Sequence, residues 1–174
     1  MANDDKNRTA ALGQIRQFGD PALKEESRTV EVDDELRKLV DRMIKIMHAA
    51  DGVGLAAPQI GVLRKVIVFR FDKEEHVLIN PEITWSSEET ITEPEGCLSL
   101  ASLAVDVERH EAVKVEGEDL EGNRKILELE GLKARILQHE IDHLQGLMVV
   151  NRCSREQRKD LMSRLRQIKL PGED

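Results

Sequence analysis

Two histidines and a glutamate in the C-terminal third of the chain have the types and spacing of a metal-dependent hydrolytic site. Residues 138–143 read Gln-His-Glu-Ile-Asp-His and lie where apolar residues recur at helical spacing. Side chains four residues apart share a helix face, roughly 5–6 Å apart at Cβ, so His139 and His143 can hold one divalent metal ion. Glu140 lies at the margin of that face, where it can reach a metal-bound water and act as a general base. This H-E-x-x-H pattern is fairly specific on a helix, the alternative being a solvated helix that happens to carry two histidines.

A catalytic metal site needs a third protein ligand, and the residues alone leave its identity open. One class of zinc peptidases continues to a third histidine, but this chain has Val149 there. The remaining candidates are a carboxylate or one of His48, His76, His110, Cys97 and Cys153. His48 falls near the end of an expected helix and suits a terminal cation, whereas His76 and His110 suit surface or structural positions. Cys97 stands out because a glycine precedes the thiol and an apolar stretch follows it.

Three separated motifs connect this site to a known family. Residues 52–59 read Gly-Val-Gly-Leu-Ala-Ala-Pro-Gln, residues 95–99 read Glu-Gly-Cys-Leu-Ser, and residues 138–143 carry the two histidines. In this order the motifs resemble those of the peptide deformylases, which remove the formyl group from the initiator methionine of new bacterial proteins. The resemblance extends from about residue 15 to about residue 151. It implies a hydrolase that acts on N-formylmethionyl nascent peptides.

The resemblance also implies which residues are catalytic. With a fourth position left open to water, the metal ligands would be Cys97, His139 and His143. A metal-bound hydroxide would attack the formyl carbon, while Glu140 accepts a proton and later delivers it to the leaving amine. The oxyanion would receive hydrogen bonds from the side chain of Gln59 and the backbone N–H of Leu98.

Five further positions match substrate-binding residues of the family. By resemblance, Gly54 pairs with the peptide backbone and Gly96 belongs to the same groove. A pocket for the methionine side chain would be formed by three apolar residues, which could equally be plain core residues: Val53, Leu132 and Ile136.

Other residues near the motifs are expected to support the site or to modify it. Glu95 matches a family residue that pairs with an arginine, here Arg109, and Asp142 is expected to accept a hydrogen bond or to lie at the surface. Arg135 falls where some relatives have an apolar residue, so the pocket mouth could differ. Many relatives have a proline near residues 100–103, where this chain has none. This departure leaves the peptide preference beyond methionine open.

Neither the metal nor the role of the last helix is determined by the sequence. Histidine and thiolate ligands accept several divalent metals. The resemblance implies Fe2+ in the cell, while a purified preparation could carry Zn2+, Ni2+ or Co2+. Residues 152–170 are rich in lysine and arginine and are expected to form a basic C-terminal helix. This helix would present either a solvated surface or a contact with the ribosome, which some relatives are thought to make.

Composition limits the setting in which this chemistry takes place. The 174 residues are expected to form a single catalytic domain, residues 1–174, with a flexible tail at residues 1–10. A net charge of −8 gives no general preference for DNA or for anionic membranes. The sequence shows no apolar run near the roughly 20 residues that span a bilayer, and its first ten residues lack the apolar centre of a signal peptide. Two cysteines fit a reducing compartment, so the expected location is the cytoplasm.

Hydrophobic periodicity predicts the elements that must position these residues. Capping aspartates and apolar residues at helical spacing indicate a helix from about residue 34 to about residue 50. Pro81 is expected to end one strand, and Gly122 with Asn123 to form a hairpin turn. Strands are expected at residues 65–71, 76–80, 83–92 and 126–129, and residues 103–115 alternate as strands do, with an interruption near residue 110. The pattern favours an α+β fold with antiparallel β-sheets packed around a central metal-binding helix, an N-terminal helix and a C-terminal helix.

Two other functions remain open on the sequence. A zinc endopeptidase would use the same histidines and glutamate, but Val149 and a cysteine ligand disfavour it. A metal-binding homologue that only associates with ribosomes would need neither Glu140 nor Gln59. Cleavage of casein would support the endopeptidase, and cleavage of formyl-peptides would exclude the homologue without catalysis.

Overall fold

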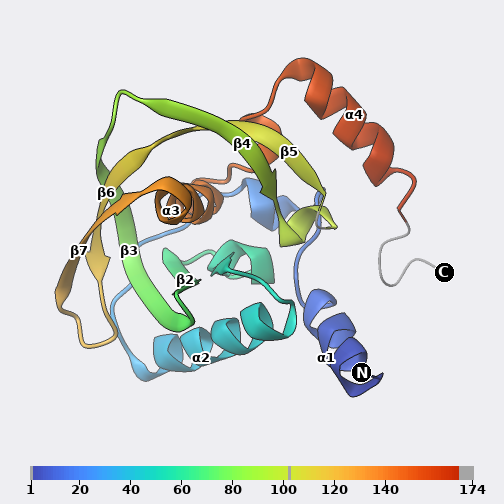
Figure 1. Ribbon diagram of the computed structural model, residues 1–174. Helices are drawn as coiled ribbons and strands as arrows, with labels where there is room; N and C mark the ends of the chain where they lie inside the picture. The colour runs from blue at the N-terminus through green and yellow to red at the C-terminus, as the bar shows by residue number, and fades with distance from the viewer. Residues whose placement is uncertain (1, 102, 169–174) are drawn as a thin grey trace.

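The computed structural model describes residues 2–101 and 103–168 and has an α+β fold (Figure 1). The α-helices are α1 (Ala2–Leu12), α2 (Asp34–Ala49), α3 (Gly131–Leu144) and α4 (Arg155–Leu165). The strands are β1 (Gly54–Ala56), β2 (Val66–Phe71), β3 (Glu74–Ser86), β4 (Thr90–Gly96), β5 (Ala104–His110), β6 (Ala112–Glu118) and β7 (Arg124–Glu130). Short 3-10 helices lie between them: η1 (Pro21–Lys24), η2 (Ala57–Ile60), η3 (Leu98–Leu100) and η4 (Val149–Asn151).

The strands form two antiparallel sheets on either side of α3. Five strands pair in the order β1-β2-β3-β6-β7, and β4 pairs with β5 in a separate two-stranded sheet. Helix α3 lies near the middle of the molecule, between the curved large sheet and the β4–β5 pair (Figure 1). The prediction of antiparallel sheets around a central helix is therefore confirmed.

Alternation along β2 explains how one sheet holds two helices. Side chains of successive strand residues point to opposite faces, so a consecutive apolar run can pack on both sides. Val66 and Val68 belong to the apolar cluster around α2, whereas Ile67 and Phe69 belong to the cluster around α3. Each fully buried side chain of this size stabilises the fold by roughly 1.5–3 kcal/mol relative to an exposed one. These two clusters fix α3, and hence the histidines, relative to β1 and β2.

Helix α2 begins where the sequence predicts. Asp33 Oδ1 accepts a hydrogen bond from the backbone N–H of Leu36 at 2.7 Å, which satisfies one of the free donors at the helix start. The buried face of the helix carries the predicted apolar residues Leu36, Val40, Met43 and Met47. Both methionines therefore belong to the core.

The predicted strand boundaries around Pro81 are wrong. Strand β3 continues through Pro81 to Ser86, instead of ending at residue 80. The register with β6 shifts between Ile79 and Glu82, and in such a bulge a residue without an N–H is tolerated. The predicted strand at residues 83–92 is therefore divided between β3 and β4. Ser87 marks the break, where its Oγ accepts from the N–H of Ala112 at 3.0 Å.

Helix α1 replaces the predicted flexible tail. Within residues 1–10 the structure describes residues 2–10, and all of them belong to α1. Ala11, in the last turn, and Ile15, just beyond it, are buried in the same cluster as Val40 of α2. Residues 5–10, most of them polar, are exposed, which is why composition alone suggested a tail.

The basic C-terminal helix is shorter than predicted. Helix α4 spans Arg155–Leu165, and Ser154 caps it by accepting from the N–H of Gln157 at 3.2 Å. Of the predicted residues 152–170, residues 152–154 precede the helix and residues 169–170 lie outside the described residues. Leu161 is fully buried and fastens α4 to the rest of the molecule. Among the described helices, none combines the length and apolar character needed to cross a membrane.

Candidate metal centre and active site

Helix α3 and the end of β4 bring together the three predicted metal ligands. Cys97 follows β4 directly, and His139 and His143 lie one turn apart on α3. His143 Nε2 is 3.5 Å from Cys97 Sγ and 3.2 Å from His139 Nε2. The three ligand atoms all lie within 4.8 Å of one another. They could therefore bind one metal ion.

The donor set and the ring orientations fit a divalent metal. Two imidazole nitrogens and a sulfur converge on one point, which is the ligand chemistry of zinc or another borderline-soft ion. His139 Nδ1 lies 2.9 Å from Glu95 Oε2, a contact that places the Nδ1 proton toward Glu95 and leaves Nε2 free. Burial lowers the pKa of His143, so a neutral ring that can donate its lone pair is favoured. Three protein ligands, with room beside them, are typical of catalytic sites.

Glu95 orients His139 because it is held as a carboxylate. Burial favours the neutral acid, but hydrogen bonds from His139 and Arg109 lower the pKa of Glu95 to about 2. Arg109 donates from Nε to Oε1 at 2.9 Å and from Nη2 to Oε2 at 3.0 Å. This is the Glu95–Arg109 pair that the sequence predicts. Such bidentate pairs fix both the position and the plane of the carboxylate.

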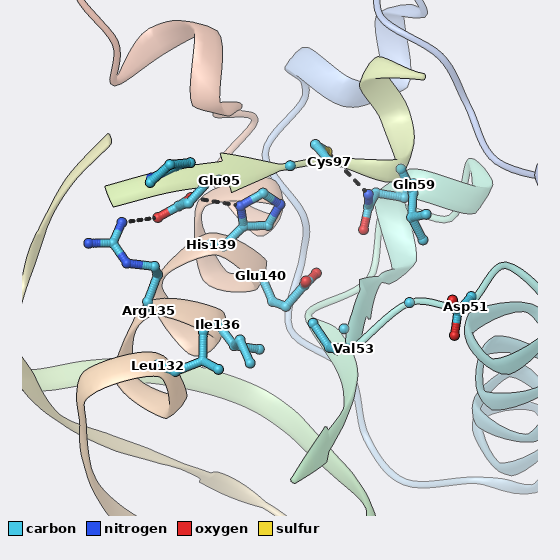
Figure 2. A pocket seen from close by; sticks show the side chains of 15 residues that line it. Asp51, Val53, Gln59, Glu95, Cys97, Leu132, Arg135, Ile136, His139 and Glu140 are labelled. Atoms are coloured by element: carbon cyan, nitrogen blue, oxygen red, sulfur yellow. Dashed lines mark hydrogen bonds and ion pairs between the residues drawn. The ribbon is translucent and has the colours of Figure 1, made fainter. Parts of the chain in front are cut away.

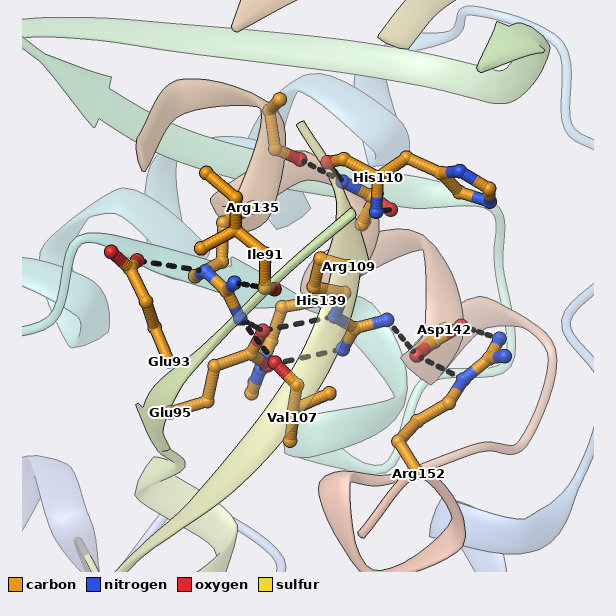
Figure 3. Close-up of polar contacts among 12 residues, drawn as sticks. Ile91, Glu93, Glu95, Val107, Arg109, His110, Arg135, His139, Asp142 and Arg152 are labelled. Carbon is orange, nitrogen blue, oxygen red and sulfur yellow. Dashed lines mark hydrogen bonds and ion pairs between the residues drawn. The ribbon is translucent and has the colours of Figure 1, made fainter. Parts of the chain in front are cut away.

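The pair continues into a chain of charges that runs from the buried interior to the surface (Figure 3). Arg109 Nη1 donates to Asp142 Oδ2 at 2.6 Å, and Asp142 also accepts from Nη2 of Arg152 at 2.6 Å. Asp142 is thus a buried acceptor, one of the two alternatives predicted for it. Through this chain, α3 is linked to β5 and to the segment before α4.

Arg135 lies at the edge of the cavity, but its guanidinium is turned toward Glu95 and is buried. Its Nη1 donates to Glu95 Oε1 at 2.7 Å and to the carbonyl of Val107 at 2.9 Å. Its Nη2 donates to the carbonyl of Ile91 at 2.7 Å. Arg135 therefore ties α3 to both β4 and β5. This role was not predicted, because Ile91 and Val107 contribute only backbone carbonyls and the resemblance pairs Glu95 with Arg109.

Glu140 projects from α3 into the cavity (Figure 2). Burial, which disfavours the ionised form, raises the pKa of its carboxyl to about 7. Its Oε2 is buried and has no hydrogen-bond partner among the described residues. A pKa near neutrality suits a group that must both accept and release a proton.

Gly54 makes room for this carboxyl. A Cβ on Gly54 would lie 2.8 Å from Cδ of Glu140 and 3.0 Å from its Cγ, too close for carbon atoms. Glycine at this position of β1 therefore allows the strand to approach α3 closely. This close approach is by itself a reason for glycine at this position of the first motif.

Gln59 lies across the cavity from Glu140. Its Oε1 accepts from the N–H of Ala56 at 2.9 Å, and its Nε2 donates to Ser99 Oγ at 3.2 Å. Nε2 is also 3.7 Å from Cys97 Sγ (Figure 2). Leu98, which starts η3, presents a backbone N–H at a helix start, where no partner exists within the helix. Ser99 was not singled out in the sequence, although it belongs to the second motif.

All five predicted substrate-binding residues line one cavity of about 300 Å³, together with Gln59, Cys97, Leu98, His139 and Glu140. Val53 is 50% exposed and Leu132 is 68% exposed, so both form the rim, whereas Ile136 is 9% exposed and forms a wall. Large apolar residues exposed at a cavity rim are not plain core residues. This arrangement can receive an apolar side chain.

The other histidines do not join the metal ligands. His48 forms an ion pair with Glu75 at the end of α2. His110 Nδ1 bonds the carbonyl of Ser87 at 2.7 Å, and the His76 ring stacks on Phe69 with 5.3 Å between ring centres. Surface and structural positions were expected for His76 and His110.

The chain is similar to peptide deformylases in sequence and in structure. The sequence profile of the polypeptide deformylase family matches residues 12–159. A peptide deformylase of Thermodesulfovibrio yellowstonii is 45% identical over 150 residues, which cover 83% of this chain and 90% of the relative. The crystal structure of a peptide deformylase from Synechococcus elongatus in complex with actinonin gives a TM-score of 0.83 at 38% identity, covering 86% of this chain and 84% of that one. One from Legionella pneumophila gives 0.84 at 38% identity, covering 88% and 92%.

Sequence and fold agree over most of this chain and most of each relative, which defines the class: this is a metal-dependent hydrolase. More narrowly, the chain belongs to the polypeptide deformylase family, enzymes that remove formyl groups. The prediction from three motifs is confirmed at this level.

Proposed function

We propose that this enzyme removes the formyl group from N-formylmethionyl nascent peptides with Glu140 as general base and acid. The observation that carries the proposal is a buried carboxyl, with a pKa of about 7, in the same cavity as Cys97 and His139. Glu140 takes a proton from the attacking water and returns it to the amine that leaves with the peptide. A divalent metal held by Cys97, His139 and His143 would polarise the formyl carbonyl and acidify a bound water.

Two donors are placed to stabilise the oxyanion that forms on the formyl group. Gln59 turns its Nε2 toward Cys97, and the N–H of Leu98 belongs to the next peptide unit along the chain. Each donor aimed at a developing oxyanion is worth about 10²–10³ in rate. Both line the cavity on the side of η3.

An extended peptide fits the strand edges beside the cavity. Among the described strands, β1 pairs only with β2, and β4 pairs only with β5. Gly54 of β1 and Gly96 of β4 both line the cavity, so each strand can offer backbone groups to a substrate there. Adding a strand to a free sheet edge is a common mode of peptide binding. Val53, Leu132 and Ile136 would then hold the methionine side chain.

Release of formate from an N-formyl-methionyl tripeptide tests the proposal. The protein is purified without oxygen, its metal is quantified, and Glu140→Gln serves as a variant of nearly equal size that cannot accept a proton. We expect the variant to retain its metal while kcat falls by at least about 10²-fold, in the range for a lost proton-transfer group. A variant that keeps both its metal and its rate would refute the assignment of Glu140. No formate from fully Fe2+-loaded protein would refute the reaction itself.

For the cell we propose Fe2+ as the metal and the cytoplasm as the location. Imidazole and thiolate ligands accept Fe2+, and two cysteines without a disulfide fit a reducing compartment. Metal analysis of protein isolated from cells without exposure to air tests the first point, and zinc as the main metal would contradict it. Fractionation of the source cells tests the second.

We also propose that α4 contacts the ribosome. Leu161 is buried, while Arg158, Lys159 and Arg164 are exposed. Basic residues outnumber acidic ones in this short helix, although the chain as a whole is acidic. Contacts with RNA phosphates weaken as salt rises. Reversing these three charges to glutamate should reduce co-sedimentation with ribosomes, most clearly at low salt. Reversal of Arg37, Lys38 and Lys45, all exposed on α2, is the matched control of three charges, and equal binding by both variants contradicts the proposal.

A further inference from the structure

The turn that follows Cys97 includes one of the two proposed oxyanion donors and contacts the other. Leu98 supplies one donor from its own backbone, and Ser99 accepts the hydrogen bond that orients the amide of Gln59. The turn ends at Ala101, whose φ of +49° is in the left-handed region that residues other than glycine rarely adopt. Such a conformation persists only where neighbouring groups hold it.

One side chain bridges the two ends of this turn. Gln17, from the segment between α1 and η1, donates from Nε2 to the carbonyl of Leu98 at 3.1 Å. Its Oε1 accepts from the backbone N–H of Ala101 at 3.3 Å. A primary amide is the neutral group that both donates and accepts in this way. The turn is thus closed by a residue 81 positions earlier in the chain.

The segment that carries Gln17 is itself attached to the same donors. The N–H of Arg16 donates to the carbonyl of Gln59 at 2.7 Å, and the N–H of Phe18 donates to the carbonyl of Ser99 at 2.8 Å. Gln17 Nε2 also lies 3.2 Å from the carbonyl of Ile15, which limits its rotamers. Both backbone neighbours of Gln17 therefore fix its position relative to Gln59 and Ser99.

We propose that Gln17 is a positioning residue for the oxyanion site, one that acts through Leu98 and Ala101 without touching substrate. The proposal rests on the proposed function, because it takes Leu98 and Gln59 to be the donors. The bond from Gln17 to the carbonyl of Leu98 fixes the peptide unit that follows Leu98. The preceding unit, which carries the Leu98 N–H, is held by the turn's own hydrogen bond from the N–H of Leu100 to the carbonyl of Cys97 at 3.0 Å, so the direction of that N–H depends on the shape of the turn that Gln17 closes. Loss of the bridge should lower kcat and leave KM nearly unchanged, since the oxyanion forms only during the reaction.

Two substitutions separate the two halves of the bridge. Gln17→Ala removes both hydrogen bonds, whereas Gln17→Glu keeps an acceptor for Ala101 and loses the donor to Leu98. We expect kcat for a formyl-methionyl tripeptide to fall about tenfold in both, less than the 10²–10³ of a fully lost donor. Metal content should be unchanged. Gln14→Ala is the control, because Gln14 is exposed in the same segment and bonds only Arg42 among the described residues, at 3.2 Å.

A second readout, independent of activity, is hydrogen exchange of the backbone amides at residues 98–101. It should speed up at least tenfold in both Gln17 variants and not in Gln14→Ala. Unchanged exchange, or unchanged kcat with the metal retained, overturns the proposal; if Gln17→Ala fails to fold, Gln17→Glu decides. If the unsubstituted protein releases no formate, the proposed function has failed, and the exchange comparison still decides whether Gln17 holds the turn.

Discussion

Adding a single methyl group at Gly54 should impair catalysis through Glu140. The Cβ of Gly54→Ala would lie 2.8 Å from Cδ of Glu140, about 0.7 Å closer than the roughly 3.5 Å at which carbon atoms pack. Both residues are buried, so either the carboxyl or β1 must move by about that amount. Misplacing a reacting group by about 1 Å can cost about 10²-fold in rate. We therefore expect kcat to fall by about 10–10²-fold.

The assay is steady-state formate release by protein of matched metal content, with unfolding by urea measured in parallel. Overpacking of this kind typically costs about 1–3 kcal/mol, so the variant should still fold. Gly13→Ala is the control, because a Cβ there meets only ordinary contacts, 3.5 Å from the carbonyl of Thr9. A Gly54→Ala enzyme with kcat within twofold of the original would refute the reasoning, since Glu140 would then tolerate displacement.

Three further predictions concern charge, pH and the metal. Arg109→Met should lower the free energy of unfolding by about 3–5 kcal/mol because it removes one charged partner from each of two buried carboxylates, Glu95 and Asp142, whereas Arg152→Met, with a side chain 43% exposed, should cost about 1 kcal/mol or less; equal losses in urea would contradict this. Partial desolvation opposes ionisation of Asp119, but hydrogen bonds from Asn123 and Lys125 lower its pKa to about 2. The stability that this carboxylate contributes is present above its unfolded pKa, near 4, and is lost as pH falls toward 2. Asp119→Ala should therefore lower Tm at pH 7 and not at pH 2, and an equal decrease in Tm at both pH values would contradict this. Metal at about 100 times its Kd should stabilise the fold by about 2.7 kcal/mol. A chelator should therefore lower Tm in the original enzyme but not in Cys97→Ser. Identical changes in Tm would exclude Cys97 as a ligand.

Local patterns in the sequence account for much of the site. The H-E-x-x-H spacing places His139, Glu140 and His143 correctly because helix geometry alone relates them. Cys97 could be assigned only through the family resemblance, since its distance from the histidines depends on how β4 packs against α3. The exposure of Leu132 at the rim, against the burial of Ile136 one turn later, likewise depends on tertiary packing.

Contacts with backbone carbonyls explain most of what sequence reasoning missed. Gln17, and Arg135 beside its ion pair with Glu95, donate to main-chain carbonyls, which every residue carries and which leave no trace in residue type. The helix at residues 2–12 was missed because its described contacts with the core come from Ala11 and Leu12 at its end, with Ile15 just beyond it, which are too few for a periodic signal. The strand predicted before Pro81 ends too early because a bulge cannot be recognised in a sequence when its partner strand is unknown.

The two-stranded sheet β4–β5 makes one side of the site less stable than the rest. A pair of strands alone is marginally stable in water, so this ribbon depends on what attaches to its flanks. Glu95, Arg109 and Arg135 are such attachments, and Cys97, at its end, becomes another when a cation is bound. The ribbon should therefore open as one local unit before the rest of the molecule unfolds, and more often in the metal-free enzyme. A ligand that bridges β1 and β4 would keep that unit from opening. Protection of the ribbon against proteolysis would therefore measure ligand binding without any turnover.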